Sequence, residues 1–181
     1  MTKTRIAING FGRIGRNFLR EFFRRANEFQ QFEIVAINDL ADTHTMAHLF
    51  KYDSVHGVFG GEVSSTESEL KINEFTINAY SKKSPSDLPW AALDVGIVLE
   101  STGIFRTKEL ASQHLMAGAK KVILSAPPMD NEVSTVVLGI NDCILGNNET
   151  IVSNASCTTN NAAPLIQLVD EFCEIETAYI T

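Results

Sequence analysis

Cys157 lies in a run of small polar residues that is suited to nucleophilic chemistry. The run spans residues 154–160. It follows a short apolar run, 150–153, that is typical of a strand, and it leads into a helical pattern over 162–172. At such a strand-to-helix junction, free backbone N–H groups and the helix dipole favour a thiolate and bind anions. The alternative is a buried, inert cysteine, but consecutive polar residues do not suit a dry core.

A glycine-rich turn near the N-terminus is typical of dinucleotide-binding proteins. Gly10, Gly12 and Gly15 form a G-x-G-x-x-G pattern, with Arg13 and Ile14 between the second and third glycines. The strand-like run 4–9 precedes the turn and apolar residues at helical spacing follow it, which is the order that the fingerprint requires. A glycine turn without a ligand is the alternative. The flanking pattern favours a pyrophosphate site on the backbone of this turn.

Asp39 ends the second predicted strand, residues 32–39, somewhat more than twenty residues beyond Gly15. An acid at this place accepts hydrogen bonds from the adenosine ribose and repels a 2′-phosphate, so we expect NAD rather than NADP. The alternative is a helix N-cap for the segment that begins at Asp42.

The remaining pattern predicts an α/β fold. Helices are expected over 43–51 and 107–117, a hairpin over 69–72 and 75–80, and strands over 94–100, 121–124, 135–138, 151–152 and 174–181. Apolar strands that alternate with helices predict a Rossmann-like, doubly wound and mainly parallel sheet with an inserted hairpin. The strand over 94–100 delivers Thr102 and Gly103 to the carboxyl edge of the sheet, where such folds bind ligands. His44 and His48 are expected on a solvated helix face, and Cys173 is expected to be packed.

The order Ala-Ser-Cys-Thr-Thr-Asn over residues 155–160, followed by Pro164, resembles the active-site signature of the phosphorylating glyceraldehyde-3-phosphate dehydrogenases. Members of this family usually carry cysteine and leucine where this chain has Asn161 and Ala162. The resemblance covers the chain but only the first half of a family member. It therefore implies an NAD-binding Rossmann domain over 1–155 and the first helix and strand of a truncated catalytic domain over 156–181. The family's catalytic histidine is expected beyond Thr181.

The resemblance also implies roles for individual residues. Cys157 is the expected catalytic nucleophile, and Ser156 and Thr158 are expected to bind the substrate or phosphate together with it. The residues expected to bind the cofactor are Gly10, Gly12, Arg13, Ile14, Gly15, Asp39, Lys83, Thr102, Gly103 and Ser125. No metal is expected.

The implied reaction is the NAD-dependent oxidation of glyceraldehyde 3-phosphate, with inorganic phosphate, to 1,3-bisphosphoglycerate through a cysteine thioester, a step of glycolysis. Sulfur suits this chemistry because a thiolate is a good nucleophile and later a good leaving group. A full-length family member is expected to be a homotetramer, and the 181-residue chain alone is expected to be inactive. Two alternatives stay open: an erythrose-4-phosphate dehydrogenase, and a non-catalytic NAD-binding or interaction module.

Composition narrows the remaining classes of protein. A net charge of −7 and a pI of about 5.1 argue against nucleic acid as the main partner. No apolar run approaches the roughly 18 residues of a membrane-spanning helix, so no membrane is expected. The three cysteines form no C-x-x-C pair and no signal-peptide pattern is present, which favours the cytoplasm. At 181 residues, one domain with part of a second is expected.

Overall fold

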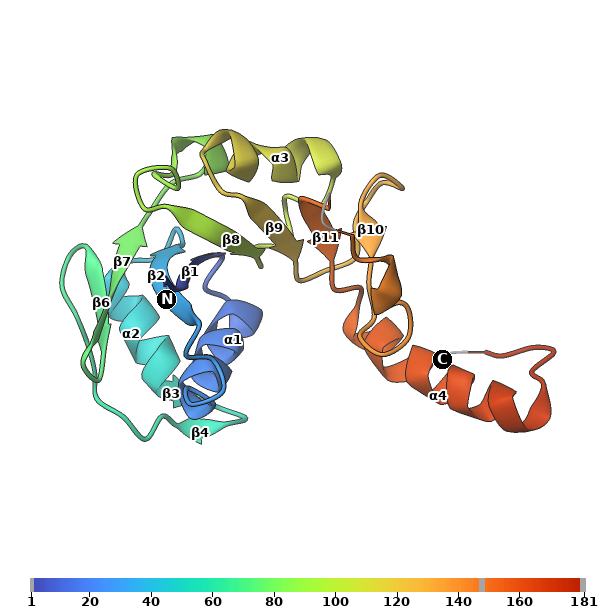
Figure 1. Cartoon of the computed structure of the whole chain (residues 1–181). Helices are drawn as coiled ribbons and strands as arrows, with labels where there is room; N and C mark the ends of the chain where they lie inside the picture. The colour runs from blue at the N-terminus through green and yellow to red at the C-terminus, as the bar shows by residue number, and fades with distance from the viewer. Residues whose placement is uncertain (1, 147–148, 180–181) are drawn as a thin grey trace.

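The structure, a computed structural model, describes residues 2–146 and 149–179. In this part of the chain nine strands form one sheet in the order β10-β11-β9-β8-β1-β2-β7-β6-β5 (Figure 1). The strands from β10 to β7 run parallel, whereas β6 and β5 add antiparallel pairs beyond β7. The bounds are β1 Thr4–Asn9, β2 Phe32–Asn38, β5 Val63–Ser65, β6 Glu69–Ile72, β7 Phe75–Tyr80, β8 Val95–Glu100, β9 Lys121–Leu124, β10 Ser134–Thr135 and β11 Ile151–Ser153.

Helices cover the sheet on both faces. Helices α1 (Arg13–Arg24) and α2 (Thr43–Lys51) lie on one face and α3 (Lys108–Met116) lies on the other (Figure 1). Ile8, Leu19 and Phe50 meet in the core on the α1 side, and Trp90 is fully buried with Val98 on the opposite face. The central strands are apolar on both faces because each face is covered by helices. The predicted doubly wound, Rossmann-type fold is confirmed.

Local signals explain where the helices begin. Asp42 Oδ1 accepts a hydrogen bond from the N–H of Thr45 (2.8 Å), and Thr107 Oγ1 accepts one from the N–H of Leu110 (3.2 Å). These are N-caps, which satisfy backbone donors that the first turn leaves unpaired. The predicted hairpin is also present as β6 and β7. A short antiparallel ribbon, β3 (Tyr52–Asp53) and β4 (Gly57–Val58), follows α2, and 3-10 turns cover Pro85–Asp87 and Asp142–Ile144.

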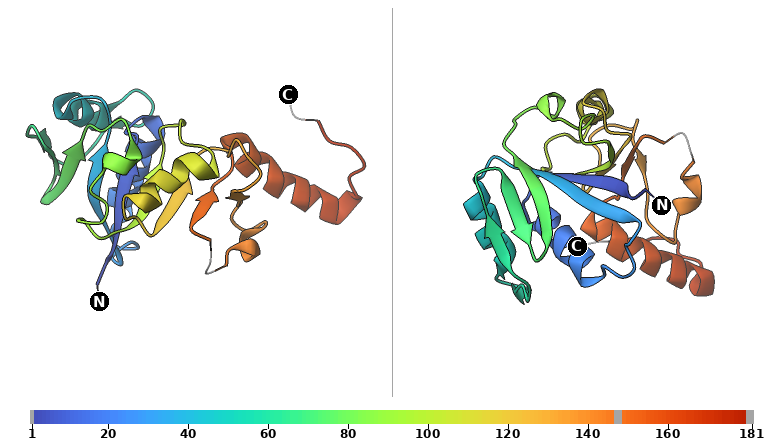
Figure 2. Two further views of the ribbon diagram at one scale, coloured as in Figure 1. Left: turned by 90° about the horizontal axis from the view of Figure 1, so that it is seen from above. Right: turned by 60° about the vertical axis from the view of Figure 1, so that its left-hand side comes forward.

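The last helix, α4 (Cys157–Cys173), leaves the sheet and projects away from it (Figures 1 and 2). Every residue of α4 is described, and none of them is buried. Pro164 lies inside this helix instead of marking its start. Cys173 is exposed, so the expectation that it is packed is wrong.

Two predicted strands differ from the structure. The strand predicted over 174–181 is wrong for its described part, because residues 174–179 form no strand. Since α4 carries them away from the sheet, their backbone groups have no sheet edge to pair with. Residues 180–181 lie outside the described residues. The strand predicted over 135–138 is only Ser134–Thr135, because the Asn141 side chain holds the chain in a turn by accepting from Val137 N (2.7 Å).

Candidate nucleotide-binding site and cysteine

The glycine turn after β1 lies close against the end of β8. Gly10 has a φ of +93°, and a Cβ at this position would lie 2.6 Å from the backbone nitrogen of Thr102. Ser101 Oγ donates to the carbonyl of Gly10 (2.6 Å), which holds the two strand ends together. A Cβ on Gly15 would lie 2.3 Å from Gly10 O, so this third glycine allows α1 to pack against the turn. Side chains at either position would push the turn away from the sheet.

The N-terminus of α1 has free donors beside open space. Gly12 is the N-cap residue, and in the described part of the chain no side chain caps the helix there. The first turn carries no acidic residue, and a Cβ on Gly12 would meet no described atom within 4 Å. Burial, with the nearby charge of Arg13, lowers the pKa of Arg16, whose Nη1 donates to Phe11 O (2.9 Å). Backbone N–H groups of this kind, with the positive end of the helix dipole, bind phosphates.

Asp39 lies beside this turn and does not cap a helix. Its Oδ2 accepts from the N–H of Phe11 (2.6 Å) and its Oδ1 accepts from the N–H of Ala41 (2.9 Å). The N-cap of α2 is Asp42, so the alternative role considered for Asp39 is filled by another residue. Each carboxylate oxygen of Asp39 keeps a lone pair for a further donor such as a ribose hydroxyl.

Five of the residues predicted to bind the cofactor line one cleft of about 480 Å³ at the carboxyl ends of β1, β2 and β8. They are Gly10, Gly12, Asp39, Lys83 and Thr102. The sequence argument did not single out the other residues of the lining, which are Asn9, Asn38, Leu40, Lys82, Ser101, Ile104 and Phe105. The signal at Asn9 and Asn38 was a polar residue that directly follows an apolar run at the end of a strand, and both are buried.

The other predicted site residues do not line this cleft in the described structure: Arg13, Ile14, Gly15, Gly103, Ser125, Ser156, Cys157 and Thr158. Arg13 Nη1 reaches Asp53 Oδ2 (3.5 Å), and the Ile14 side chain is half exposed. Ser125 follows β9, one strand further along the same edge, and its N–H donates to Glu100 O (2.9 Å). It therefore extends the row of strand ends toward β11.

Cys157 is the first residue of α4, directly after β11, and its side chain is exposed. The junction is well held, because Ser156 Oγ accepts from Thr159 N (2.9 Å) and Asn160 Nδ2 donates to Asn154 O (2.7 Å). The N–H of Asn154 donates to Leu124 O (2.9 Å), which ties the junction to the end of β9. The predicted strand-to-helix junction at Cys157 is confirmed.

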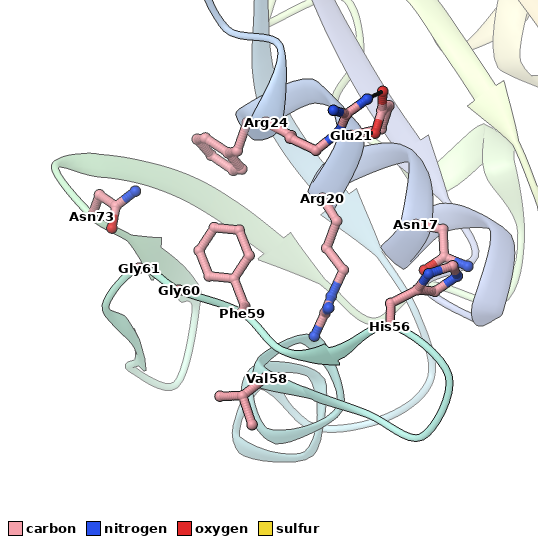
Figure 3. Close-up of a pocket in the computed structure, with 11 residues that line it drawn as sticks. Asn17, Arg20, Glu21, Arg24, His56, Val58, Phe59, Gly60, Gly61 and Asn73 are labelled. Carbon is pink, nitrogen blue, oxygen red and sulfur yellow. Dashed lines mark hydrogen bonds and ion pairs between the residues drawn. The ribbon is translucent and has the colours of Figure 1, made fainter.

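A second hollow, of about 650 Å³, lies between α1 and residues 56–61 (Figure 3). Its cations are already engaged: Arg20 donates to Phe50 O (3.0 Å) and Gly57 O (3.1 Å), and Arg24 pairs with Glu21 (2.7 Å). None of the predicted site residues lines it. The hollow is therefore a less favourable phosphate site than the N-terminus of α1.

The described residues contain neither a cluster of metal ligands nor a membrane-spanning helix. No three His, Cys, Asp or Glu side chains lie close enough together there to hold a metal ion. None of the helices in the same residues has the length and apolar character needed to cross a bilayer.

A parallel sheet with a glycine turn, an uncapped helix N-terminus and an acid after the second strand defines a dinucleotide-binding protein of the Rossmann class. The family model described as glyceraldehyde 3-phosphate dehydrogenase, NAD binding domain, matches residues 4–108. This chain therefore belongs to the glyceraldehyde-3-phosphate dehydrogenase family, whose cofactor at this domain is NAD.

Named relatives agree with this assignment. The chain is 49% identical over 177 residues to the glyceraldehyde-3-phosphate dehydrogenase of Thermotoga maritima, and equally so to that of Pseudomonas aeruginosa. It is 45% identical over 178 residues to that of Clostridium pasteurianum. Each alignment covers 98% of this chain and 52% of the relative, so the chain spans about half the length of the curated relatives it matches.

Proposed function

We propose that this chain provides the NAD-binding part and the cysteine nucleophile of a phosphorylating glyceraldehyde-3-phosphate dehydrogenase. The main support is that the glycine turn after β1 and Cys157 after β11 both follow parallel strands, and so lie at the same carboxyl edge of one sheet. The boundary between an NAD-binding domain over 1–155 and a catalytic segment from 156 is part of the proposal. Ala155, with a φ of +57°, turns the chain just before the N-cap Ser156.

The residues of the cleft fit NAD. The uncapped N-terminus of α1 would hold the pyrophosphate, Asp39 the adenosine ribose, and Lys83 would lie at the adenine end. Thr102 lines the cleft and Gly103 follows it in the same turn, and Ser125 would contact the nicotinamide half from the end of β9. When bound, NAD supplies a hydride acceptor. The described residues would bind and orient it.

Cys157 would carry the covalent chemistry. Its thiolate adds to the aldehyde carbon of glyceraldehyde 3-phosphate, and the carbonyl oxygen takes a proton. Loss of a hydride from carbon and a proton from oxygen leaves a thioester on sulfur. An oxygen of inorganic phosphate then attacks the acyl carbon, which releases the thiolate and 1,3-bisphosphoglycerate. Ser156, Thr158 and the N-terminus of α4 would hold the phosphate.

Turnover by this chain alone should be slight. Among the described residues none of the four histidines is hydrogen-bonded to Cys157, so the general base that this chemistry needs is not beside the thiol. We also propose a cytoplasmic location, which is supported by the three free, exposed cysteines, and a homotetramer for a full-length family member.

Nucleotide titration of two glycine variants tests the proposed cleft. A Cβ on Gly12 or on Gly60 would meet no described atom within 4 Å, so Gly12→Ala and Gly60→Ala should both fold. Only Gly12 lies where a pyrophosphate would approach the backbone. We expect Gly12→Ala to raise the Kd for NAD by about tenfold, or about 1.4 kcal/mol, and Gly60→Ala to leave it unchanged. NADP should bind more weakly than NAD because of Asp39. Equal affinities for both variants would contradict the proposal.

A further inference from the structure

A set of polar side chains is buried directly beneath the cleft. Asn9 at the end of β1, Asn38 at the end of β2, Glu100 at the end of β8 and His114 on α3 are each at most 5% exposed, and the indole of Trp90 lies fully buried beside them. A buried carboxylate is unfavourable unless it is paired and hydrogen-bonded. Burying this ionisable pair is therefore energetically unfavourable, which indicates that the pair has a function.

Hydrogen bonds fix the protonation of this set. Trp90 Nε1 donates to His114 Nδ1 (3.0 Å), and an indole nitrogen can only donate, so Nδ1 carries no proton. The ring proton therefore lies on Nε2, which donates to Glu100 Oε2 (2.9 Å). Asn9 Nδ2 donates to the same oxygen. Glu100 Oε2 thus accepts from two side chains, and the imidazole of His114 accepts at Nδ1 and donates at Nε2.

The other oxygen of Glu100 holds one wall of the cleft. Oε1 accepts from the backbone N–H of Thr102 (2.8 Å) and from the Thr102 hydroxyl. The Thr102 hydroxyl in turn accepts from the N–H of Ile104 (3.1 Å). Thr102 and Ile104 both line the cleft, so the carboxylate sets the path of the turn that follows β8.

The same network reaches the opposite wall. Asn38 Nδ2 donates to Asn9 Oδ1 (2.7 Å) and to Lys82 O (2.9 Å), and Asn38 Oδ1 accepts from Lys82 N (2.8 Å). Lys82 also lines the cleft. Both walls are therefore connected, through Asn9, to one carboxylate whose orientation is fixed by His114 and Trp90.

We propose that Glu100 and His114 are positioning residues for the nucleotide, which hold the Thr102 turn and the Lys82 segment at the spacing that NAD requires. Neither side chain lines the cleft, so both act through the residues that do. The neutral imidazole serves as a rigid spacer that accepts on one side and donates on the other. This role depends on the nucleotide site proposed above.

Calorimetric titration with NAD of wild type, His114→Leu and His114→Gln tests the role. A glutamine amide can accept from Trp90 and donate to Glu100, as the neutral imidazole does, whereas leucine can do neither. We expect His114→Leu to raise the Kd roughly tenfold and His114→Gln to stay within roughly threefold of wild type. The matched control is Ile72→Val, which opens a small cavity in the fully buried part of β6, two strands beyond β2 in the sheet, and should leave the Kd unchanged.

The unfolding midpoint in urea of each variant separates positioning from stability. Equal affinity of folded His114→Leu and wild type would overturn the proposal, as would equal losses of affinity in His114→Leu and His114→Gln. If His114→Leu does not fold, Glu100→Gln replaces it. Its amide nitrogen would face either the donors of His114 and Asn9 or the N–H of Thr102, so the same rise in Kd is expected, and wild-type affinity would overturn the proposal.

Hydrogen exchange distinguishes failure of this proposal from failure of the nucleotide site. A wild-type chain that binds no NAD would contradict the proposed function. In that case the hydrogen-exchange rates of the backbone amides of Thr102 and Ile104 test the positioning role. Faster exchange in His114→Leu, with protection kept in His114→Gln, supports it. Wild-type protection in His114→Leu would overturn it.

Discussion

The two ends of α4 each carry a cysteine, and we expect the two thiols to react at different rates. Cys157 is the first residue of the helix and Cys173 the last, and both are exposed. A helix N-terminus carries partial positive charge and a C-terminus partial negative charge. The first turn of α4 contains no acidic residue, while Asp170, Glu171 and Glu174 lie close to Cys173 in the sequence. Negative charge that develops on sulfur during alkylation is therefore favoured at Cys157 and disfavoured at Cys173.

The size of the effect follows from the helix dipole. Each helix end contributes about 0.3–1 kcal/mol to the free energy of a nearby charge, so the two sites differ by about 0.6–2 kcal/mol. Expressed as an equilibrium ratio, that difference in free energy is about 3- to 30-fold. Nucleophilicity falls as basicity falls, with a coefficient of about 0.5, so the alkylation rates should differ by about two- to fivefold.

Alkylation with iodoacetamide at pH 7, followed by mass spectrometry of the peptides, measures both rates in one sample. The control is the same reaction in concentrated guanidinium chloride, where the helix is lost and the ratio should fall toward one. Equal labelling of Cys157 and Cys173 in the folded chain would refute the reasoning. A twofold ratio that survives unfolding would do the same, because it would come from local sequence alone.

Three further outcomes are expected. Gly10→Ala should lower the free energy of unfolding in urea by about 2–3 kcal/mol, because its φ is +93° and a Cβ would collide with backbone; a loss below about 0.5 kcal/mol would contradict this. Hydrogen bonds from the N–H groups of His56 and then Val55 lower the pKa of Asp53 from 3.8 to about 2, so its stabilising effect is complete above pH 3.8 and lost as pH falls through 2. Carbon-13 NMR of that carboxyl should show the midpoint near 2, not 3.8. The dye ANS should bind the exposed apolar side chains of α4, and Phe172→Glu should weaken its fluorescence while the unfolding midpoint stays constant.

The fold was predictable where the periodic signals were long. Apolar strand runs and helix caps such as Asp42 and Thr107 specify local structure directly, and the structure places elements within a few residues of those signals. Polar and apolar residues also alternate over 174–181, as they do in a strand. This alternation does not provide a neighbouring strand for hydrogen bonding. A strand forms only where a second strand lies beside it, and this depends on where α4 points, which no local pattern encodes.

The site was predictable where single residues have strict requirements. Gly10 and Gly15 are needed for a close backbone approach, and Asp39 follows a strand end, so each has a recognisable position. The buried partners of the cleft have no such motif. The role of Asn9 and Asn38 is recognised only when β1 and β2 are known to be neighbours. This pairing brings Asn38 Nδ2 within 2.7 Å of Asn9 Oδ1, although the two residues are 29 positions apart in the sequence. The roles assigned to all the predicted site residues stay predictions.

Different interactions hold the cleft and the Cys157 thiol in place. The cleft lies at the ends of central strands, and its walls are tied to buried groups such as Glu100 that are costly to move once desolvated. Cys157 begins a helix whose side chains are all at least partly exposed, and the cap at Ser156 and the bonds from Asn154 and Asn160 hold it to the sheet. Local stability follows buried contacts. The nucleotide half should therefore be rigid on its own, whereas the orientation of the thiol depends on what packs against α4.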